Sequence, residues 1–334
     1  MKLRLGIVGL GLIWENIHMP ILMDMKEQFE IKAFCVHNEK KIPLWQQRLP
    51  GAAAYTDYRR MVQDSSVDAV VVTTPLEMNA EVTLAALEAG KDVFCEKPMA
   101  VHVDVADRIM EMEKQTGKTV YVLEQFLYNP QLPVMKKIID GKQLGEFVSF
   151  ERTTHYLMDS SNEGYGQTQW RRKSDFPLGH IYDGGVHEIA LLNELFGMPE
   201  EMYAVGQSFR EEMGKYDHIL TMFHYPSGAT GVFSHSAFLA CSKNYFYIRF
   251  TEGSLYVYGD KLVLEHKNGG TEELNTAEGN TYRAMWMELA RKSLGMESSP
   301  LRRRMLKTAC GCWMRWSSPS NPTSAPLSNN SLFF

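Results

Sequence analysis

Three residues of the sequence have side chains and positions that suit proton transfer beside a reacting oxygen. Asp183 and His187 are four residues apart, which on a helix is a rotation of about 40°, so both side chains would face the same side. Lys97 stands between Glu96 and Pro98, directly after an apolar stretch. Oxidation of an alcohol needs a base for the hydroxyl proton and a donor that stabilises the charge developing on the oxygen. A histidine and a lysine could supply these two roles.

Each of these residues also has a purely structural explanation. Lys97 would be an exposed lysine at the end of a strand, Asp183 the N-cap of a helix, and His187 a half-buried histidine with satisfied hydrogen bonds. The spacing alone does not choose between the explanations. The choice depends on the elements that would position the three side chains.

The chain opens with a short apolar run that ends in glycines, MKLRLGIVGLG. This pattern predicts a buried parallel strand followed by a tight turn. Gly9 and Gly11 occupy the first two glycine positions of G-x-G-x-x-G, the turn that lets a backbone approach a dinucleotide pyrophosphate. The phosphates would rest on the amides of the helix that begins at Leu12 and Ile13. The third position holds Trp14 rather than a small residue, and a plain strand-to-turn connection is the alternative.

Strands and helices alternate through the part of the chain that follows. Further strands are predicted at Glu30–Val36, Asp68–Thr73, Lys91–Cys95 and Thr119–Leu123, and helices at Ile13–Met25, Tyr58–Gln63, Glu81–Ala89 and Val101–Gln115. Alternation with short connections predicts an α/β fold with a doubly wound (Rossmann) parallel sheet, in which ligands bind beyond the carboxyl ends of the strands. The residues that fall at those ends are Gly9, Gly11, Val36, His37, Thr74, Pro75 and Lys97. This coincidence favours a dinucleotide site over a plain turn.

The identity of the cofactor depends on the end of the strand Glu30–Val36. In an NAD-binding unit this end usually offers an Asp or Glu to the adenosine ribose hydroxyls. Here His37 and Asn38 follow the strand, without a carboxylate at either position. The pattern leans slightly towards NADP over NAD, because a 2′-phosphate would be repelled by an acid and would accept hydrogen bonds from His37, Asn38 or Lys40. The alternative is that His37 and Asn38 form a solvated turn.

The second half of the chain shows a different pattern of predicted elements. Strands are predicted at Glu146–His155, Met202–Phe209, His218–Tyr225, Ala229–His235, Tyr245–Thr251 and Ser254–Tyr258, with one helix at Gly185–Phe196. Short turn signals separate several of these strands, which predicts antiparallel hairpins. We therefore expect a dinucleotide-binding domain over residues 1–124, an α+β domain over 125–307, and an atypical tail rich in Ser, Pro and Asn over 308–334.

Composition excludes several classes of protein. The 334 residues suggest two domains, and 44% hydrophobic with 22% charged residues is ordinary for a globular protein. A net charge of −5 without a basic cluster argues against nucleic acid and anionic membranes as partners. The apolar runs are too short to span a bilayer. The five cysteines show no metal spacing, so we expect reduced thiols, a cytoplasmic location and no bound metal.

Four motifs together resemble a known family. GIVGLG, the Thr-Thr-Pro turn, AALEAGKDVFCEKPMA and DGGVHEI are similar to the glucose-fructose oxidoreductase/inositol dehydrogenase family of NAD(P)-dependent enzymes, with Glu-Lys-Pro the most specific mark. The resemblance implies a Rossmann domain paired with an open-faced, mostly antiparallel sheet. It also implies sugar, polyol or inositol substrates and a homodimer or homotetramer formed through that sheet.

The resemblance implies roles for the three residues considered first. Lys97 would lie in the active site and hold the reacting oxygen, His187 would accept the proton, and Asp183 would bind or orient the substrate. Whether His187 or Lys97 is the base stays open. Glu96 would contact the cofactor ribose or orient its neighbours.

Further candidates line the expected substrate site. Trp170 and Arg171 precede the histidine motif as a Trp-Arg pair does in family members, and would contact substrate or cofactor. His155, Tyr156 and Tyr182 would line a polyol pocket, with plain packing as the alternative.

The sequence also departs from the family pattern. Besides Trp14, Asn79 stands where many members have His, Leu127 where many have Arg, and Ala190 where the histidine motif often continues with Asp. These changes alter the surroundings of substrate and cofactor, so a named substrate cannot be transferred from the family. Two other functions also stay open. One is a non-catalytic regulator that binds NAD(P) and a sugar, and the other is a reductase of a different carbonyl or imine substrate, such as a biliverdin-like one.

Overall fold

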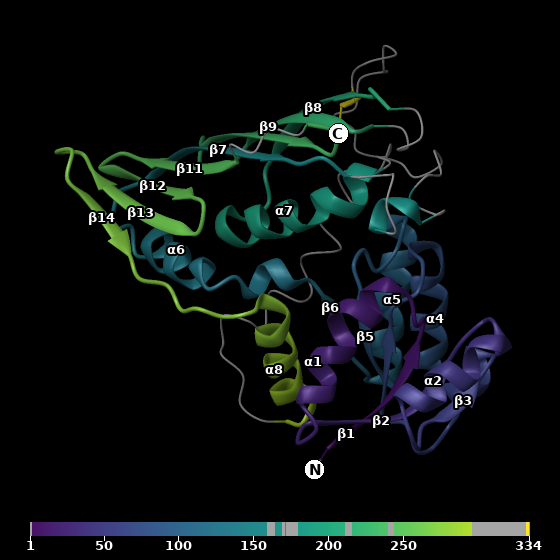
Figure 1. Cartoon of the computed structure of the whole chain (residues 1–334). Helices are drawn as coiled ribbons and strands as arrows, with labels where there is room; N and C mark the ends of the chain where they lie inside the picture. Colours follow the sequence, from purple (N-terminus) through teal and green to yellow (C-terminus); the bar gives the residue numbers. More distant parts are fainter. Residues whose placement is uncertain are drawn as a thin grey trace. The chain divides into compact units, whose positions relative to one another are not determined.

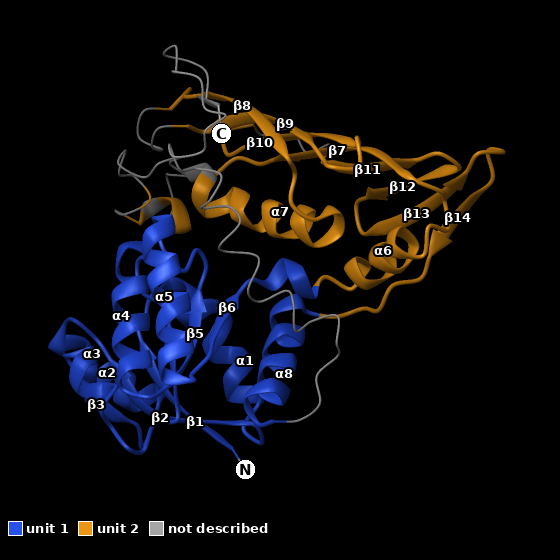
Figure 2. Cartoon of the chain, turned by 180° about the vertical axis from the view of Figure 1, so that it is seen from behind, with its two compact units in different colours: residues 1–128, 280–314 blue, residues 129–279, 315–334 orange. Residues whose placement is uncertain are grey.

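The computed structural model describes residues 2–158, 164–168, 171, 180–210, 216–239, 244–295 and 332–333. The chain forms two compact units (Figure 2). The first contains residues 1–128 and 280–314, and the second contains residues 129–279 and 315–334. The first unit is therefore made from two stretches of chain that are separated by the second.

The described residues of the first unit contain a parallel sheet with the strand order β3-β2-β1-β4-β5-β6. The strands are β1 (Leu3–Val8), β2 (Phe29–Cys35), β3 (Ala53–Tyr55), β4 (Ala69–Val72), β5 (Asp92–Glu96) and β6 (Val120–Leu123). Every neighbouring pair is parallel. The order reverses between β1 and β4, where a doubly wound sheet forms its ligand crevice. The predicted Rossmann-type sheet is confirmed.

Helices connect these strands. They are α1 (Met19–Asp24), α2 (Ile42–Arg48), α3 (Tyr58–Met61), α4 (Leu76–Glu88) and α5 (Val103–Thr116). The first connection is one continuous helical run over residues 12–24, close to the predicted Ile13–Met25, but its middle part, Trp14–His18, is π-helical and α1 continues directly from it. Pro20 is the second residue of α1 and lies inside this helical run, where it has no N–H to donate to the preceding turn. Trp14 points inward and is fully buried.

The last helix of the first unit, α8 (Thr281–Ser293), comes from the far part of the chain. Its Trp286 is fully buried, with ring centroids 5.5 Å from Phe29 of β2 and 5.3 Å from Phe94 of β5. Asn280 caps the helix by accepting a hydrogen bond from the Arg283 amide. The core of the first unit is therefore completed by α8.

The second unit is built on a mostly antiparallel sheet with the order β14-β13-β12-β11-β7-β10-β9-β8-β15 (Figure 1). The strands are β7 (Phe147–His155), β8 (Glu201–Gln207), β9 (His218–His224), β10 (Thr230–Ser236), β11 (Tyr245–Phe250), β12 (Gly253–Tyr258), β13 (Lys261–His266), β14 (Thr271–Leu274) and β15 (Leu332–Phe333). Among these strands β7 and β10 pair in parallel and the other neighbours are antiparallel. The predicted second sheet is confirmed.

One face of this sheet packs on α6 (Gln131–Asp140) and α7 (His180–Phe196) (Figures 1 and 2). Phe196 of α7 stacks on Phe147 and Phe150 of β7, with ring centroids 4.4 and 5.0 Å away. The described residues place no helix on the other face. Side chains along β9 accordingly alternate between buried and exposed, as expected for a sheet with one covered face.

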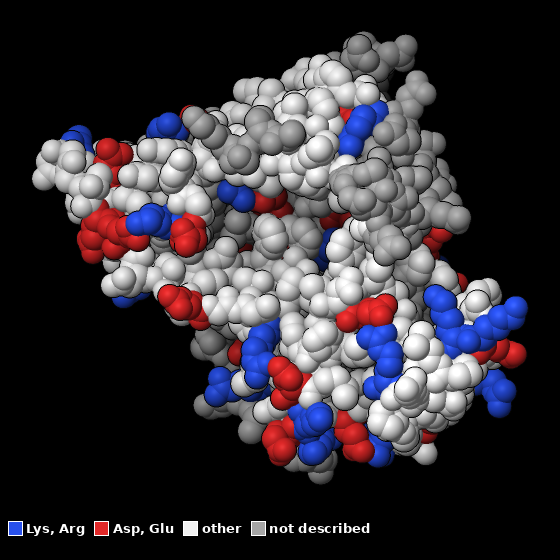
Figure 3. All heavy atoms as spheres, in the orientation of Figure 1, with Lys and Arg blue, Asp and Glu red and all other residues white. Residues whose placement is uncertain are grey.

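No helix in the described part of the chain is long and apolar enough to cross a membrane. In the view of Figure 3, acidic and basic side chains are mixed, and neither kind forms one continuous field.

Candidate active site

The glycine turn after β1 has the geometry that a dinucleotide requires. Gly9 has a φ of +92°, and a Cβ atom there would lie 2.7 Å from the carbonyl oxygen of Thr73. The Thr73 hydroxyl donates a hydrogen bond to the Gly9 carbonyl, which ties the turn to the end of β4. An added Cβ on Gly11 would meet no atom within 4 Å. Gly9 is therefore required by the fold, whereas Gly11 leaves space for a ligand.

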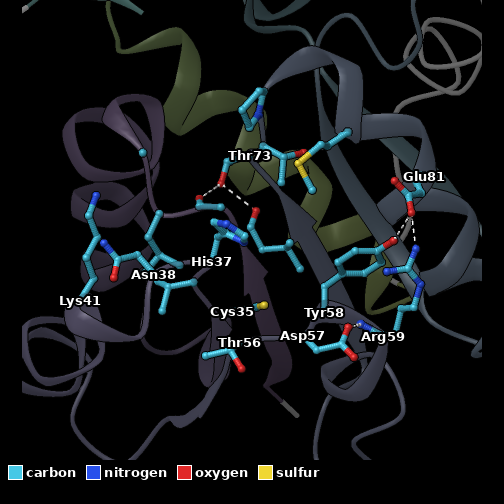
Figure 4. Close-up of a pocket in the computed structure, with 18 residues that line it drawn as sticks. Cys35, His37, Asn38, Lys41, Thr56, Asp57, Tyr58, Arg59, Thr73 and Glu81 are labelled. Carbon is cyan, nitrogen blue, oxygen red and sulfur yellow. Dashed lines mark hydrogen bonds and ion pairs between the residues drawn. The ribbon is translucent and has the colours of Figure 1, made fainter. Parts of the chain in front are cut away.

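A pocket of about 650 Å³ opens at the ends of β1, β2 and β4 (Figure 4), within the usual size range of small-molecule sites. Of the predicted cofactor residues, six line it: Gly9, Gly11, His37, Asn38, Thr74 and Pro75. Leu12, Ile13, Glu96 and Lys97 do not line this pocket. With the exception of Lys97, the predicted strand-end residues are thus brought together around one cavity.

Two basic side chains that the sequence analysis did not single out also line the pocket, Lys41 and Arg59. Arg59 pairs with Glu81, and its guanidinium lies 4.6 Å from the centre of the Tyr58 ring. The Tyr58 hydroxyl donates to the same carboxylate at 2.7 Å. Burial, together with this hydrogen bond to Glu81, raises the pKa of Tyr58 to about 12. Figure 4 shows Lys41 on one side of the pocket and this cluster on the other.

Cys35 is the thiol at the pocket wall. Burial raises the pKa of Cys35 to about 11, and the nearby charge of Asp57 contributes in the same direction. The side chain is therefore a neutral thiol at physiological pH, and it brings no negative charge to a site that would hold phosphate groups.

The turn at the end of β5 fixes the main chain around Lys97. The Lys97–Pro98 peptide bond is cis. Asn79 of α4 donates through Nδ2 to the carbonyl oxygens of Glu96, at 3.2 Å, and Pro98, at 3.1 Å. Its Oδ1 accepts a hydrogen bond from the Thr74 hydroxyl at 2.8 Å. Because Thr74 lines the pocket, Asn79 connects the pocket wall to the backbone on both sides of Lys97.

The Glu96 side chain is directed into the first unit. Its Oε1 lies 2.7 Å from Nε2 of His18, and its Oε2 accepts the Lys97 amide at 3.0 Å. On the other side of the imidazole, Trp286 Nε1 donates to His18 Nδ1 at 3.0 Å. The position of Glu96 agrees with an orienting role for this residue.

The candidate residues of the second unit gather at the start of α7. Asp183 is buried in the first turn and accepts a hydrogen bond from Arg171 Nε at 2.7 Å. His187 is half-buried one helical turn later. Tyr182 is fully buried in the core, and Trp170 lies outside the described residues.

Tyr156 belongs to the same cluster. A Cβ atom on Gly184 would come within 2.5 Å of the Tyr156 hydroxyl oxygen, so this hydroxyl lies against the backbone of α7. Burial raises the pKa of Tyr156, and the charge of Asp183 adds to the shift. The Tyr156 ring also contacts His235 edge-on, at a centroid distance of 5.6 Å.

His155 is not brought to this cluster. Arg152 contacts Glu188 of α7, and since side chains alternate along a strand, His155 projects to the helix-free face of the sheet. There its Nε2 lies 2.8 Å from the Ser234 hydroxyl. Burial lowers the pKa of His155, and the neighbouring His218 adds to the effect.

In the described part of the chain, no group of three or more His, Cys, Asp or Glu side chains could hold a metal ion.

Family models match both units. The model of an oxidoreductase family with an NAD-binding Rossmann fold matches residues 3–124, and that of the GFO/IDH/MocA C-terminal domain matches residues 134–256. The chain belongs to the GFO/IDH/MocA family of oxidoreductases. The resemblance predicted from the sequence is thereby confirmed. The family model that matches residues 3–124 describes an NAD-binding Rossmann fold.

Other members of the family differ in how much they share with this chain. An uncharacterized protein of Saccharomyces cerevisiae is 30% identical, over 83% of this chain and 80% of its own. The scyllo-inositol 2-dehydrogenase (NADP(+)) of Bacillus subtilis is 25% identical, over 67% of this chain and 60% of its own. The crystal structure of an oxidoreductase from Thermotoga maritima superimposes with a TM-score of 0.84 at 27% identity, covering 93% of this chain and 96% of that one.

Proposed function

We propose that this protein is an NAD(P)-dependent dehydrogenase that transfers a hydride between the nicotinamide and a carbinol or carbonyl carbon of a sugar, polyol or inositol-like substrate. The observation that carries the proposal is the turn at Lys97, which is held by hydrogen bonds beside the strand ends that line the pocket. The name of the Bacillus subtilis relative supports an inositol-like substrate.

The residues of the pocket fit a dinucleotide. The open space at Gly11 suits the pyrophosphate, and the amides of Leu12 and Ile13 would donate to it. Glu96 and Lys97 would complete the cofactor site towards the nicotinamide. When bound, the cofactor would supply the hydride acceptor or donor.

This chain's own residues would handle the proton and the oxygen. Lys97 would donate a hydrogen bond to the reacting oxygen and stabilise its developing charge. His187 would accept the hydroxyl proton in oxidation, and Asp183, held by Arg171, would bind or orient the substrate. Trp170 and Tyr156 are further proposed substrate contacts. His155 is not, because it lies on the other face of the sheet from α7.

The test is a screen of polyols, inositols and sugars with NAD and with NADP, in which the absorbance of the reduced cofactor reports turnover. Lys97→Ala and His187→Ala should each reduce kcat by about 10²- to 10⁴-fold, the usual worth of a positioned proton-transfer group. Loss of the acidic limb of the kcat/KM profile in one variant would identify that residue as the base. Lys114→Ala, at an exposed lysine of α5, is the control. Near-normal rates in both variants would contradict the assignment.

Within this proposal we favour NADP over NAD. His37 and Asn38 bring no carboxylate to the end of β2, and the pocket wall offers the cations of Lys41 and of Arg59, the latter paired with Glu81. Lys41→Ala and Arg59→Ala should weaken NADPH binding and leave NADH binding within about twofold, because a surface cation acts mainly on the extra phosphate. Titrations followed by cofactor fluorescence measure the binding of NADPH and of NADH to each variant. Tighter binding of NADH by the unaltered protein would reverse the preference.

The helix-free face of the second sheet is the proposed contact between subunits of a homodimer or homotetramer. Tyr203, Met222 and Val232 are neighbours across β8, β9 and β10, and they are 38, 53 and 36% exposed. A continuous apolar patch of this kind marks an interaction surface. Met222→Asp should shift the sedimentation coefficient towards that of a monomer. A protein that sediments as a monomer before substitution would refute this contact.

A further inference from the structure

A buried line of side chains leads from α8 to the backbone of Lys97. Trp286 donates to His18, His18 contacts Glu96, and Glu96 accepts the Lys97 amide, at distances of 3.0, 2.7 and 3.0 Å. Trp286 and His18 are fully buried, and Glu96 is 7% exposed. The line joins residues 268 positions apart in the sequence and lies wholly within the first unit.

The chemistry of the donors fixes the direction of these bonds. An indole N–H donates only, so Nδ1 of His18 must carry a lone pair. The proton of the neutral imidazole is therefore on Nε2, from which it is donated to Glu96. The His18 ring also meets Tyr282 and Trp286 edge-on, at centroid distances of 5.9 and 5.7 Å, which limits its rotation. Trp286 thus selects both the tautomer and the orientation of His18.

The two oxygens of Glu96 have different partners. Oε1 accepts from His18, which leaves Oε2 aimed at the Lys97 amide. Without His18, a buried carboxylate would turn towards another donor, since an unpaired buried oxygen is costly. Asn79 holds the carbonyl groups on either side of the same lysine. The Lys97 backbone is therefore held from α4 through Asn79 and from α8 through His18.

We propose that His18 and Trp286 are positioning residues for Lys97, acting through the Glu96 carboxylate. The inference rests on the proposed function of Lys97 at the reacting oxygen. It assigns to α8 a part in the reaction beyond completing the core.

The kinetic test uses three variants and a control in the full-length protein. His18→Leu removes both imidazole bonds, His18→Gln keeps an N–H donor that can reach Glu96, and Trp286→Phe keeps the ring but removes the indole donor. Trp45→Phe is the matched control, because Trp45 is an equally buried tryptophan of the first unit outside this line. Cofactor titration gives the active-site concentration of each preparation, so that loss of folded protein does not count as loss of turnover.

The inference predicts a selective loss of kcat. His18→Leu should lower kcat by about 10- to 100-fold, the effect of a displaced catalytic group, with substrate KM and cofactor Kd within about twofold. Trp286→Phe should lower kcat by about tenfold, and His18→Gln should recover part of the loss. If His18→Leu and Trp286→Phe turn over like Trp45→Phe while Lys97→Ala is inactive, the inference is wrong and the proposed function stands.

A second measurement needs no substrate. Nitrogen-15 spectra of selectively labelled histidine should show His18 as the neutral form protonated on Nε2, and Trp286→Phe should change this signal. The same signal with the proton on Nδ1, or no change in Trp286→Phe, would overturn the inference. If the signals behave as expected but no alcohol or carbonyl compound is turned over, the proposed function fails instead.

Discussion

The two units hold their buried carboxylates in different ways. In the first unit, Glu96 accepts hydrogen bonds from two uncharged donors, the imidazole of His18 and the amide of Lys97. In the second unit, Glu188 of α7 pairs with Arg152, and Asp183 pairs with Arg171. An uncharged donor leaves the negative charge in place, whereas a guanidinium neutralises it.

This difference is greatest at Glu188, which is 1% exposed. Burial alone would raise the pKa of Glu188, but the charge of Arg152 and its two hydrogen bonds hold the pKa below its usual value. The second unit thus joins α7 to β7 through a charged pair, in addition to the stacking of Phe196 on Phe147 and Phe150. In the first unit, by contrast, the pocket lies at the turns that follow β1, β2 and β4.

The largest effect is expected from removing that arginine. Arg152→Met should destabilise the second unit by about 3–5 kcal/mol, because Glu188 would remain as an unpaired buried charge. Urea unfolding with hydrogen exchange of α7 peptides measures the loss. Arg249→Met is the control, since its pair with Glu151 is roughly half exposed and worth about 1 kcal/mol or less.

A double variant separates charge from packing. Arg152→Met combined with Glu188→Leu should recover most of the lost stability, because no charge is then left buried. If the double variant is no more stable than Arg152→Met, the arginine acts through its packing and the contrast between the units disappears.

A smaller effect is expected at the glycine turn of the first unit. Gly9→Ala should cost about 1–3 kcal/mol, because its φ is positive and its Cβ would collide with the Thr73 carbonyl. Gly11→Ala should leave the stability of the cofactor-free protein within about 0.5 kcal/mol and weaken cofactor binding instead. Thermal unfolding measures the stability of the two variants, and cofactor titration measures their affinity for the cofactor. Equal stability losses in the two variants would refute the division of roles between these glycines.

The smallest effect is expected from an ion pair at the surface of the first unit, Arg4 with Asp68. Its hydrogen bond to Arg4 lowers the pKa of Asp68 below the unfolded value of about 3.9. The stabilisation is therefore complete above that value and is lost as the pH falls through the lower folded pKa. Asp68→Asn should shift the urea midpoint slightly at about pH 7, and this shift should shrink as the pH falls through the lowered folded pKa of Asp68, because the carboxylate then becomes protonated. A shift that persists in acid would mean that the charge is not responsible.

Motifs local in sequence predicted the parallel sheet and its crevice well. Gly9, Thr74 and Pro75 are close to strand ends in the sequence, so strand order alone brings them together. The short strands β3 and β14 and the helices α2 and α6 were not predicted, because their apolar periods are weak or interrupted. Trp14 stands where the glycine motif usually has a small residue, and the sequence did not predict that its indole would be buried within a π-helical segment.

Contacts between distant elements could not be predicted. The amphipathic pattern of Tyr282–Leu294 predicts a helix but does not say which core that helix enters, so the bond from Trp286 to His18 has no sequence signal. Lys41 and Arg59 follow no motif. Lys41 reaches the pocket from the 3₁₀ turn Glu39–Lys41 after β2, and Arg59 reaches it from α3. His155 and Tyr156 are adjacent in sequence, and pleating alone sends them to opposite faces.

The place of α8 in the chain has a consequence for synthesis. The strands of the first unit leave the ribosome before the second unit is made, and the helix that covers Phe29 and Phe94 follows only afterwards. During that interval the nascent first unit lacks Trp286, and its apolar side chains stay open to chaperones or to unwanted association. Among the described elements of the first unit, α8 is thus the last to be made, and it carries the tryptophan that contacts His18.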